Sequence, residues 1–294
     1  MTMARMRTVR SLVTAGLVAA VPFSLAAQSG AAPRSPRADS TRDASRLDVD
    51  GQTAKARAIF QAQIDNAPDA AAKSAAQRAM AISYAFDGDC ANAVKYEAMV
   101  IAYWVTRESA EPQNAFYQQG EMANEAARVC IDAGNLDVAE TWYRKGTELG
   151  LKEPAPKTHP TSLWEYRLTH ALGRLAARRG NTAEAAKQIA QARKILASDS
   201  AMAAAQARFL PYLEGYVALY TGDLAGAEAN LTKALALQGN GTDPFMTSLL
   251  AMTYDKQGKT AEAKALWQKA YDLSTAHNPP AAFARPLARK KLGS

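Results

Sequence analysis

Metal-binding residues are scarce in this sequence, which has only two cysteines and three histidines among 294 residues. The histidines, His159, His170 and His277, lie far apart along the chain. The sequence contains no H-E-x-x-H pair and no cluster of cysteines, so the usual spacings of zinc ligands are missing. The sequence therefore predicts neither a metal site nor a cofactor.

A phosphate-binding loop and a nucleophile elbow are also missing. The tripeptide Gly258-Lys259-Thr260 matches the end of a phosphate-binding loop, but the glycine required five positions earlier is Thr253. A helix, not a strand, is expected before it, so we interpret the tripeptide as a turn between helices. Serine and aspartate are plentiful but lack the strand–turn–helix setting of a hydrolase nucleophile. No enzyme signature is found.

Strand-forming patterns are few. Aromatic residues make up only 7% of the chain, and runs of Val, Ile and Thr at alternating spacing are lacking. Alanine is abundant instead; it is the best helix former, and its small side chain lets helices approach closely. With 48% hydrophobic residues the chain can bury a sizeable core. The composition favours an all-α fold.

The apolar run at the N-terminus, residues 11–25, is too short for a comfortable membrane span and is interrupted by Pro22. It follows three arginines and ends in the small residues of Ser24–Ala27. This order predicts a secretory signal peptide over residues 1–27, and an uncleaved membrane anchor is the alternative. The mature protein is then expected to be exported, periplasmic or secreted, with no transmembrane segment.

Composition divides the rest of the chain. Residues 28–45 are rich in Ser, Pro, Ala and Arg without apolar periodicity, so we expect a disordered linker there. Residues 46–280 form a predicted helical repeat domain. Residues 281–294 are expected to be a basic tail. The favoured interpretation is a solvated final helix that caps the domain, and the alternative is a tail that contacts an acidic partner or an anionic membrane. Three of the net +7 charges lie in residues 1–27, and the remaining excess does not argue for nucleic-acid binding.

Six sites repeat one pattern: a glycine, usually a polar residue next, and an alanine five positions after the glycine. The glycines are Gly51, Gly88, Gly134, Gly180, Gly222 and Gly258. They are spaced by 37, 46, 46, 42 and 36 residues, and such periods indicate stacked helical hairpins. The glycine can end one helix in the left-handed conformation, and Asn, Asp or Thr after it can cap the next.

Small and large residues recur in register with these turns. Twelve residues before the turn alanine lies another small residue, which lets the two helices of a hairpin touch: Ala81, Ala127, Gly173, Gly215 and Ala251. Four residues after the turn alanine a larger side chain is expected to fill the gap between units: Phe60, Tyr143, Ile189, Leu231 and Trp267.

This pattern resembles the tetratricopeptide repeat (TPR) family over about residues 47–273. The last unit is the most similar, through Leu250-Ala251, Tyr254, Gly258, Ala263, Trp267 and Ala270, and Ala56, Phe60 and Pro68 fit in the first. The three middle spacings exceed the family period of about 34 residues. The extra residues fall around 108–118 and 151–162; the second stretch has three prolines and is expected to be a loop. The first unit lacks a clear first helix.

The resemblance implies an α-solenoid of stacked antiparallel helical hairpins whose first helices line a concave groove. Residues on these helices that do not face their hairpin partner should point into that groove. The candidate binding residues are Arg128, Arg167, His170, Arg174, Phe209, Tyr212, Tyr216, Phe245 and Met252. We expect the basic group to hold carboxylates of an extended partner and the aromatic group its apolar side chains. The alternatives are a solvated face for the basic residues and an enlarged core for the aromatic ones.

The two cysteines are expected to be neighbours in a stacked array. Cys90 opens the second helix of one unit and Cys130 lies near the end of the first helix of the next, and these helices run antiparallel. Export would place them in an oxidising compartment, which favours a disulfide over a span of 40 residues. Two buried free thiols are the alternative.

The resemblance implies a non-catalytic scaffold or adaptor that binds a protein or peptide, because the TPR family generally mediates protein–protein interaction. The alternative is an envelope enzyme or carbohydrate-handling protein built on a helical solenoid. Binding of nucleic acid is not expected of an exported protein.

Overall fold

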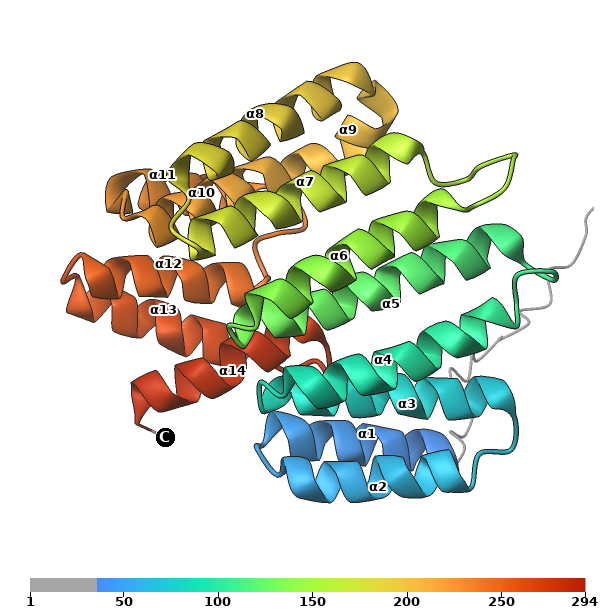
Figure 1. Ribbon diagram of the computed structural model, residues 1–294. Helices are drawn as coiled ribbons and strands as arrows, with labels where there is room; N and C mark the ends of the chain where they lie inside the picture. The colour runs from blue at the N-terminus through green and yellow to red at the C-terminus, as the bar shows by residue number, and fades with distance from the viewer. Residues whose placement is uncertain (1–35, 294) are drawn as a thin grey trace, which may run out of the picture. The chain divides into compact units, whose positions relative to one another are not determined.

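Helices make up the regular structure of residues 36–293, the part of the chain that the computed structural model describes (Figure 1). No strand occurs within residues 36–293, so the prediction of an all-α fold is confirmed there. The signal peptide predicted over residues 1–27 and the first part of the predicted linker lie outside the described residues.

Consecutive helices pack as antiparallel pairs, and each of the six repeat glycines lies in the turn of one pair. The pairs are α1 (Pro36–Val49) with α2 (Thr53–Asp65), α3 (Ala70–Phe86) with α4 (Cys90–Val105), α5 (Pro112–Asp132) with α6 (Leu136–Leu151), α7 (Thr161–Arg178) with α8 (Thr182–Ser198), α10 (Leu210–Thr221) with α11 (Leu224–Ala236), and α12 (Pro244–Lys256) with α13 (Thr260–Leu273). The helix α9 (Ser200–Gln206) and the 3₁₀ turn η1 (Ala207–Phe209) precede α10, and α14 (Pro279–Leu292) ends the chain.

The turns and contacts within the pairs are as the repeat pattern predicts. All six glycines adopt a positive φ between 67° and 90°. The caps are present in three of the six turns: Asp89, Asn181 and Asp223 each accept from a backbone amide of the following helix. Asn135 makes no such bond, and neither do Gln52 and Lys259 at the corresponding positions. The small residues twelve positions apart, such as Ala127 and Ala139, are fully buried where the two helices meet. Local sequence therefore determines each hairpin.

Helix α1 corrects two predictions. The linker expected over residues 28–45 is helical from Pro36, and this helix is the first helix that the first repeat was expected to lack. Ala44, Asp48 and Val49 are its buried residues, and Ala44 packs in one core cluster with Phe60 of α2. The composition of α1 does not indicate a helix, because few of its residues are apolar. The helix is stabilised by packing against its neighbours.

Helix α14 corrects a third prediction. The segment expected as a basic tail is a packed helix, with its four buried alanines facing α3, α12 and α13. Arg285 is buried and donates to the carbonyls of Val49, Tyr271 and Ser274. Its positive charge therefore caps the C-terminal end of α1. The segment is a final helix, as the favoured interpretation had it, but only its outer side, with Pro286, Lys290 and Lys291, is exposed.

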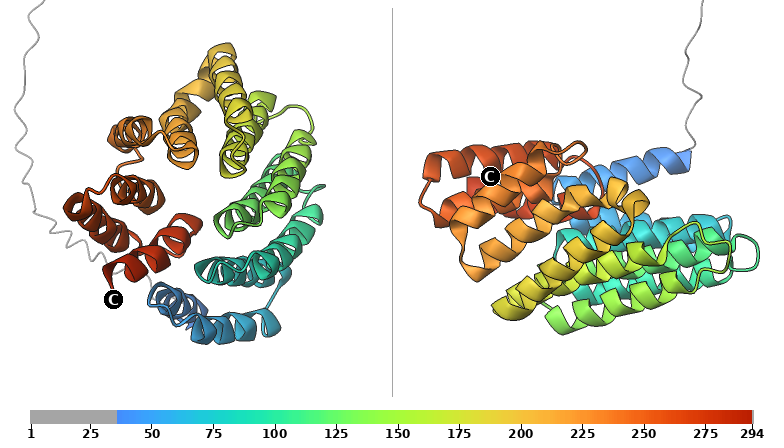
Figure 2. Two further views of the ribbon diagram at one scale, coloured as in Figure 1. Left: turned by 60° about the vertical axis from the view of Figure 1, so that its left-hand side comes forward. Right: turned by 90° about the horizontal axis from the view of Figure 1, so that it is seen from above.

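The first and last helices of the described chain are joined by further contacts. Arg289 donates to the carbonyl oxygen of Val49 at 3.1 Å, and Nε2 of His277 lies 2.8 Å from the buried carboxylate of Asp48. Figure 2 shows the helix pairs following one another along a curve, with α14 beside the earliest helices. The first turns of α14 also pack against Val129 of α5, so the start of α14 lies next to the middle of the array.

Two regions depart from regular hairpin stacking. The proline-rich stretch between α6 and α7 is a loop, as predicted. The segment from Ser200 to Phe209, which forms α9 and η1, was not anticipated, although it accounts for part of the long spacing before Gly222. Pro211 lies in the first turn of α10, where its missing N–H costs nothing.

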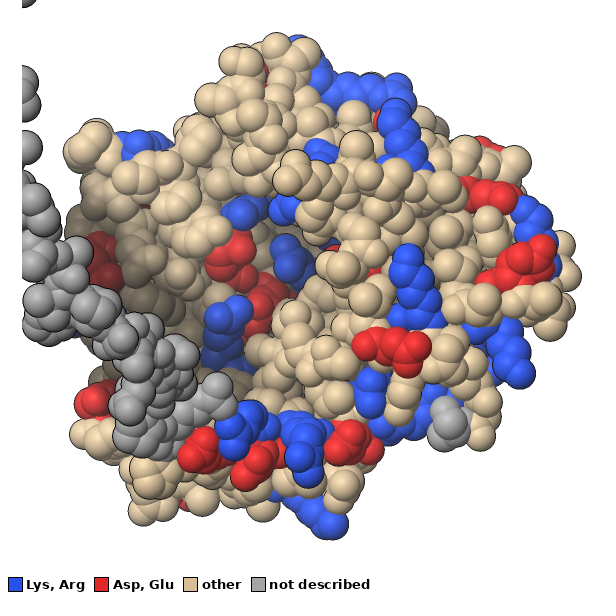
Figure 3. Space-filling model, turned by 180° about the vertical axis from the view of Figure 1, so that it is seen from behind, with Lys and Arg blue, Asp and Glu red and all other residues tan. Residues whose placement is uncertain are grey.

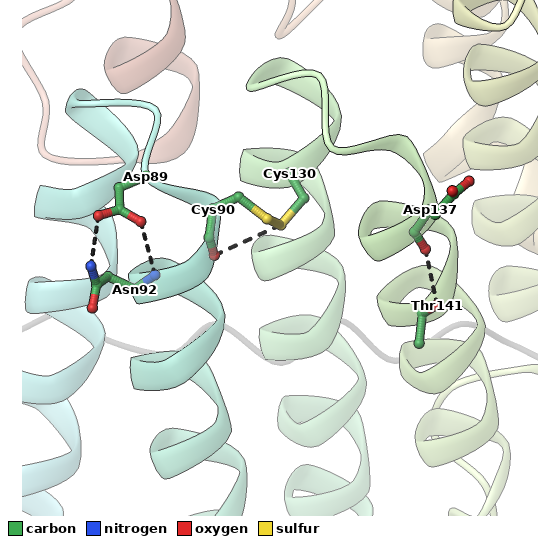
Figure 4. Close-up of a disulfide and its surroundings, with 6 residues drawn as sticks. All are labelled: Asp89, Cys90, Asn92, Cys130, Asp137 and Thr141. Carbon is green, nitrogen blue, oxygen red and sulfur yellow. Dashed lines mark hydrogen bonds between the residues drawn. A yellow bond between two sulfur atoms is a disulfide. The ribbon is translucent and has the colours of Figure 1, made fainter.

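The predicted disulfide is present: Cys90 and Cys130 are bonded, with their Cα atoms 4.7 Å apart (Figure 4). Cys90 is the first residue of α4, and Cys130 lies in the last turn of α5. The bond therefore links two consecutive hairpins at the end where α4 begins and α5 ends.

Candidate functional site

A cavity of about 430 Å³ lies where the middle of the array meets its C-terminal part. It is lined by residues of α5, α6, α7, η1, α10, α12 and α14. Figure 3 shows a hollow in the molecular surface in which basic and acidic side chains occur together. A cavity of this size with mixed aromatic and polar walls is typical of a ligand site.

The structure brings together nearly all of the predicted binding residues. Eight of the nine line this cavity: Arg128, Arg167, His170, Arg174, Phe209, Tyr212, Tyr216 and Phe245. Met252 does not line it, because it packs among the side chains between α12 and α13. Eight of the predicted binding residues therefore share one cavity wall, and Met252 lies apart from it.

The aromatic residues belong both to the core and to the cavity wall, so both alternatives considered for them hold in part. Tyr212 and Tyr216 are 8% and 1% exposed and belong to a core cluster with Leu231 and Leu249. Both also line the cavity. Their rings thus support α10 while their hydroxyl ends face polar groups of α7. The solvated face considered for His170 and Arg174 is wrong, because both are buried.

Arg174 is the central cation of this cavity. Its Nη2 donates to the Tyr143 hydroxyl at 2.8 Å, and its Nη1 donates to the Tyr212 hydroxyl at 3.3 Å. The guanidinium carbon lies 5.5 to 5.9 Å from the ring centres of Tyr143, Tyr212 and Tyr216. Among the described residues no carboxylate forms an ion pair with Arg174, and its Nε has no hydrogen-bond partner.

Tyr212 and Tyr216, beside Arg174, remain neutral hydroxyls. Burial raises the pKa of Tyr212 and of Tyr216, and the nearby arginines lower it only in part. A neutral hydroxyl that accepts from a guanidinium still has its own O–H to donate. Tyr216 accepts from Nη1 of Arg178 at 3.3 Å, so a second arginine fixes that ring.

His170 is a neutral imidazole in the wall between α7 and η1. Burial lowers its pKa well below 6.5, and the positive charges of Arg174 and Arg128 lower it further. Its Nε2 lies 3.3 Å from the Phe209 carbonyl oxygen, so this nitrogen carries the proton and donates it. The contact ties η1 to α7 and positions the Phe209 ring at the cavity.

The other arginines of the cavity differ in their partners. Arg167 forms an ion pair with Glu121 and lies over the Trp164 ring at 5.0 Å. Arg208 donates to the Gln238 carbonyl at 3.3 Å. Arg128 is exposed, and no described residue forms a hydrogen bond or ion pair with it. Arg128 and Arg174 are therefore the arginines of the wall without a carboxylate or carbonyl partner.

Two acids also line the cavity. Asp243 accepts from the Met246 amide at 2.8 Å and so caps α12. Asp132 lies in the last turn of α5; the residue has an exposed edge, but burial of its carboxyl raises the pKa to about 6. Neither acid forms an ion pair with Arg174, so the positive charge of Arg174 is not neutralised.

Several residues of the site were not predicted. Tyr143 was expected only to fill the gap between units, because its position gave no sign that its hydroxyl would meet Arg174. Pro279, Pro280 and Phe283 line the cavity from α14, which was expected to be a tail. Contacts between distant parts of the chain leave no local pattern in the sequence.

A second buried charged cluster lies outside the cavity. Glu97 occupies the position at which other repeats have Phe60, Tyr143 or Trp267, and it is 1% exposed with no hydrogen-bond partner for either oxygen. Burial, and then the adjacent Glu125, raise the pKa of Glu97 well above its usual range. Arg78 pairs with Glu125 at 2.9 Å. None of these charged groups lines the cavity, and they form part of the packing between α3, α4 and α5.

Within residues 36–293, no three His, Cys, Asp or Glu residues lie close enough together to hold a metal ion. None of the helices in the same range combines the length and apolarity needed to cross a membrane. A scan against protein-family models found no match to this chain, and a search of curated proteins found none either.

Proposed function

We propose that this chain is an exported, non-catalytic scaffold, built as an α-solenoid of the TPR kind, that binds a segment of a peptide or protein partner. The observation that carries the proposal is the wall of the cavity. First helices of three consecutive hairpins, α7, α10 and α12, each place basic or aromatic side chains on it. Tyr, Arg and Phe are the residue types that dominate binding surfaces.

The arrangement of helices supports the TPR part of the proposal. Six hairpins follow one another, and each has a positive-φ glycine in its turn and small residues at the helix contact. Such an array presents one face built from the first helix of every unit.

The disulfide supports the proposed export, because disulfides persist in oxidising compartments. The signal peptide proposed for residues 1–27 would direct the chain to the periplasm or outside the cell.

The geometry of His170 supports binding in preference to catalysis. Its Nε2–H is engaged by the Phe209 carbonyl, so the imidazole fixes the wall instead of facing a nucleophile. The arginines of the wall are suited to carboxylates, and the half-buried rings of Phe209 and Phe245 are suited to apolar side chains.

A selection from a library of random peptides displayed on phage tests the proposal with the full chain as bait. We expect enriched peptides that combine acidic with apolar residues. Phe245→Ala should weaken their binding by about 10-fold or more, since it removes an aromatic contact from the wall. Fluorescence anisotropy with labelled peptides measures the affinity.

Val138→Ala is the matched control, because Val138 is an exposed apolar residue of α6 that does not line the cavity. Its affinity for the peptides should equal that of the original chain. The proposal is wrong if no peptide is enriched, or if Phe245→Ala and Val138→Ala bind the selected peptides equally well.

A further inference from the structure

Arg174 is a buried cation whose charge no described residue balances. Its side chain is 7% exposed, it lines the cavity, and its partners are the neutral hydroxyls of Tyr143 and Tyr212. Burying a charge is costly unless it is paired. The cation–π contacts with the tyrosine rings offset part of this cost, but they leave the positive charge in place.

The acids of the cavity do not supply the missing charge. The Asp243 carboxylate caps α12 through the Met246 amide, and Asp132 lies near the end of α5 and forms no ion pair with Arg174. Their presence on the wall also disfavours a ligand with two negative charges, because like charges repel in a partly desolvated cavity.

The hydroxyls next to Arg174 add hydrogen-bond donors to the cation. Tyr143 and Tyr212 each accept from one terminal nitrogen of Arg174, so the O–H of each remains able to donate. A guanidinium flanked by two hydroxyl donors is suited to an oxyanion with two oxygens in one plane.

The remaining walls near this site are apolar. Phe209, Phe245 and Phe283 line the cavity from η1, α12 and α14. Tyr212 packs edge-on against Phe245 with the ring centres 6.4 Å apart, and Phe245 packs against Phe283 at 5.5 Å. The cavity volume of about 430 Å³ lies in the range of small-molecule sites, which extends from about 300 to 1,000 Å³.

We infer that this cavity binds a small organic carboxylate with an aromatic or aliphatic body, whose carboxylate lies between Arg174, Tyr143 and Tyr212. The inference goes beyond the proposed scaffold function, because the ligand is a free small molecule and its binding needs no partner protein. It uses the same cavity, so the small carboxylate and a peptide would compete.

Isothermal titration calorimetry of the full chain tests this inference with three probes of similar size. The probes are 3-phenylpropionate, its neutral amide 3-phenylpropionamide, and phenyl phosphate. We expect 3-phenylpropionate to bind at least about 10-fold more tightly than the amide, because only the acid balances the charge of Arg174. Equal affinity for acid and amide, or tighter binding of phenyl phosphate, would overturn the inference.

Two variants locate the carboxylate. Arg174→Met keeps a long side chain without charge and should weaken 3-phenylpropionate binding by at least about 10-fold. Arg193→Met is the control, because Arg193 pairs with Glu214 on the surface and does not line the cavity. If Arg174→Met does not fold, Tyr212→Phe, which removes one donor and keeps the ring, should weaken binding of the acid and leave that of the amide unchanged. Unchanged acid binding in a folded Arg174→Met or in Tyr212→Phe contradicts the assigned position.

The outcomes separate this inference from the scaffold function. If selected peptides bind and 3-phenylpropionate neither binds nor displaces them, the small-molecule site is wrong and the scaffold function stands. If 3-phenylpropionate binds and no peptide does, the scaffold function fails and this inference stands.

Discussion

Removing the Cys90–Cys130 disulfide lowers the free energy of unfolding by about 4 kcal/mol, because the bond closes a span of 40 residues in the unfolded chain. The expected loss is large because the bond joins two hairpins. Without it, the unfolded chain gains conformational entropy over α4, α5 and the loop between them. Urea unfolding of the oxidised protein and of Cys90→Ala/Cys130→Ala measures the difference. Alanine is preferred to serine because both positions are buried.

The double variant also supplies the control for reduction. A thiol reductant should destabilise the original chain and have no effect on the variant. Thiol titration of the unfolded, unreduced protein should find no free thiol. A loss of stability below about 1 kcal/mol, or two free thiols, would contradict this account of the bond.

Replacing Gly150 by valine is expected to destabilise the protein by about 3 kcal/mol or more, since it overfills a tight contact. A Cβ atom at Gly150 would lie 2.1 Å from Cε2 of Trp164, whose ring is fully buried. Gly120 also lies against this indole, and a Cβ atom there would lie 2.4 Å from Cη2. The ring is thus held between α5 and α6 and cannot move aside. Thermal and urea unfolding measure the loss.

Glu148→Val is the matched control, because Glu148 lies on the exposed side of the same helix and tests the cost of valine in a helix alone. In a double-mutant cycle, Gly150→Val should cost less stability in a Trp164→Leu background than in the original chain, since the smaller side chain makes room. An equal cost in both backgrounds would mean that the contact with Trp164 is not the cause.

The sequence predicted the hairpins because their determinants are local. The glycine, the capping residue and the small contact residues lie within a few turns of one another, and each has one physical role. The structure confirms this for Gly88, Asp89 and Ala93 in one turn and for Gly258 and Ala263 in another. Residues that fill the gaps between units, such as Leu231 and Trp267, follow from the same register.

Helices at the ends of the array could not be predicted in this way. Helix α1 has few apolar residues, and its fold depends on contacts such as the one from Arg37 to the Gln63 and Ala72 carbonyls. Helix α14 owes its position to Arg285, which reaches Val49 across 236 residues of sequence. A periodic pattern in the sequence gives no information about contacts between such distant residues.

The candidate site was predictable in part, because the spacing of residues along one helix is a local property of the sequence. Helical spacing placed His170, Arg174, Tyr212 and Tyr216 on one face, and they do line one cavity. The burial of Tyr212 and Tyr216 agrees with the core alternative stated for them. The burial of His170 and Arg174 was not predicted, because it depends on contacts between distant helices, such as that of Arg174 with Tyr143 of α6. Met252 does not line the cavity, because it packs against two core clusters on either side of α12.

Photo-crosslinking is the most direct measurement of the central claim, which is that the partner segment lies in the cavity. A benzoylphenylalanine residue replaces Phe245, which lines the cavity, or Val138, which is exposed on α6. The full chain is irradiated with a peptide from the library selection, and mass spectrometry locates the crosslinks. The account predicts a crosslink from position 245, its suppression by excess unlabelled peptide, and none from position 138. A specific crosslink from position 138 with none from position 245 would place the partner elsewhere and contradict the account.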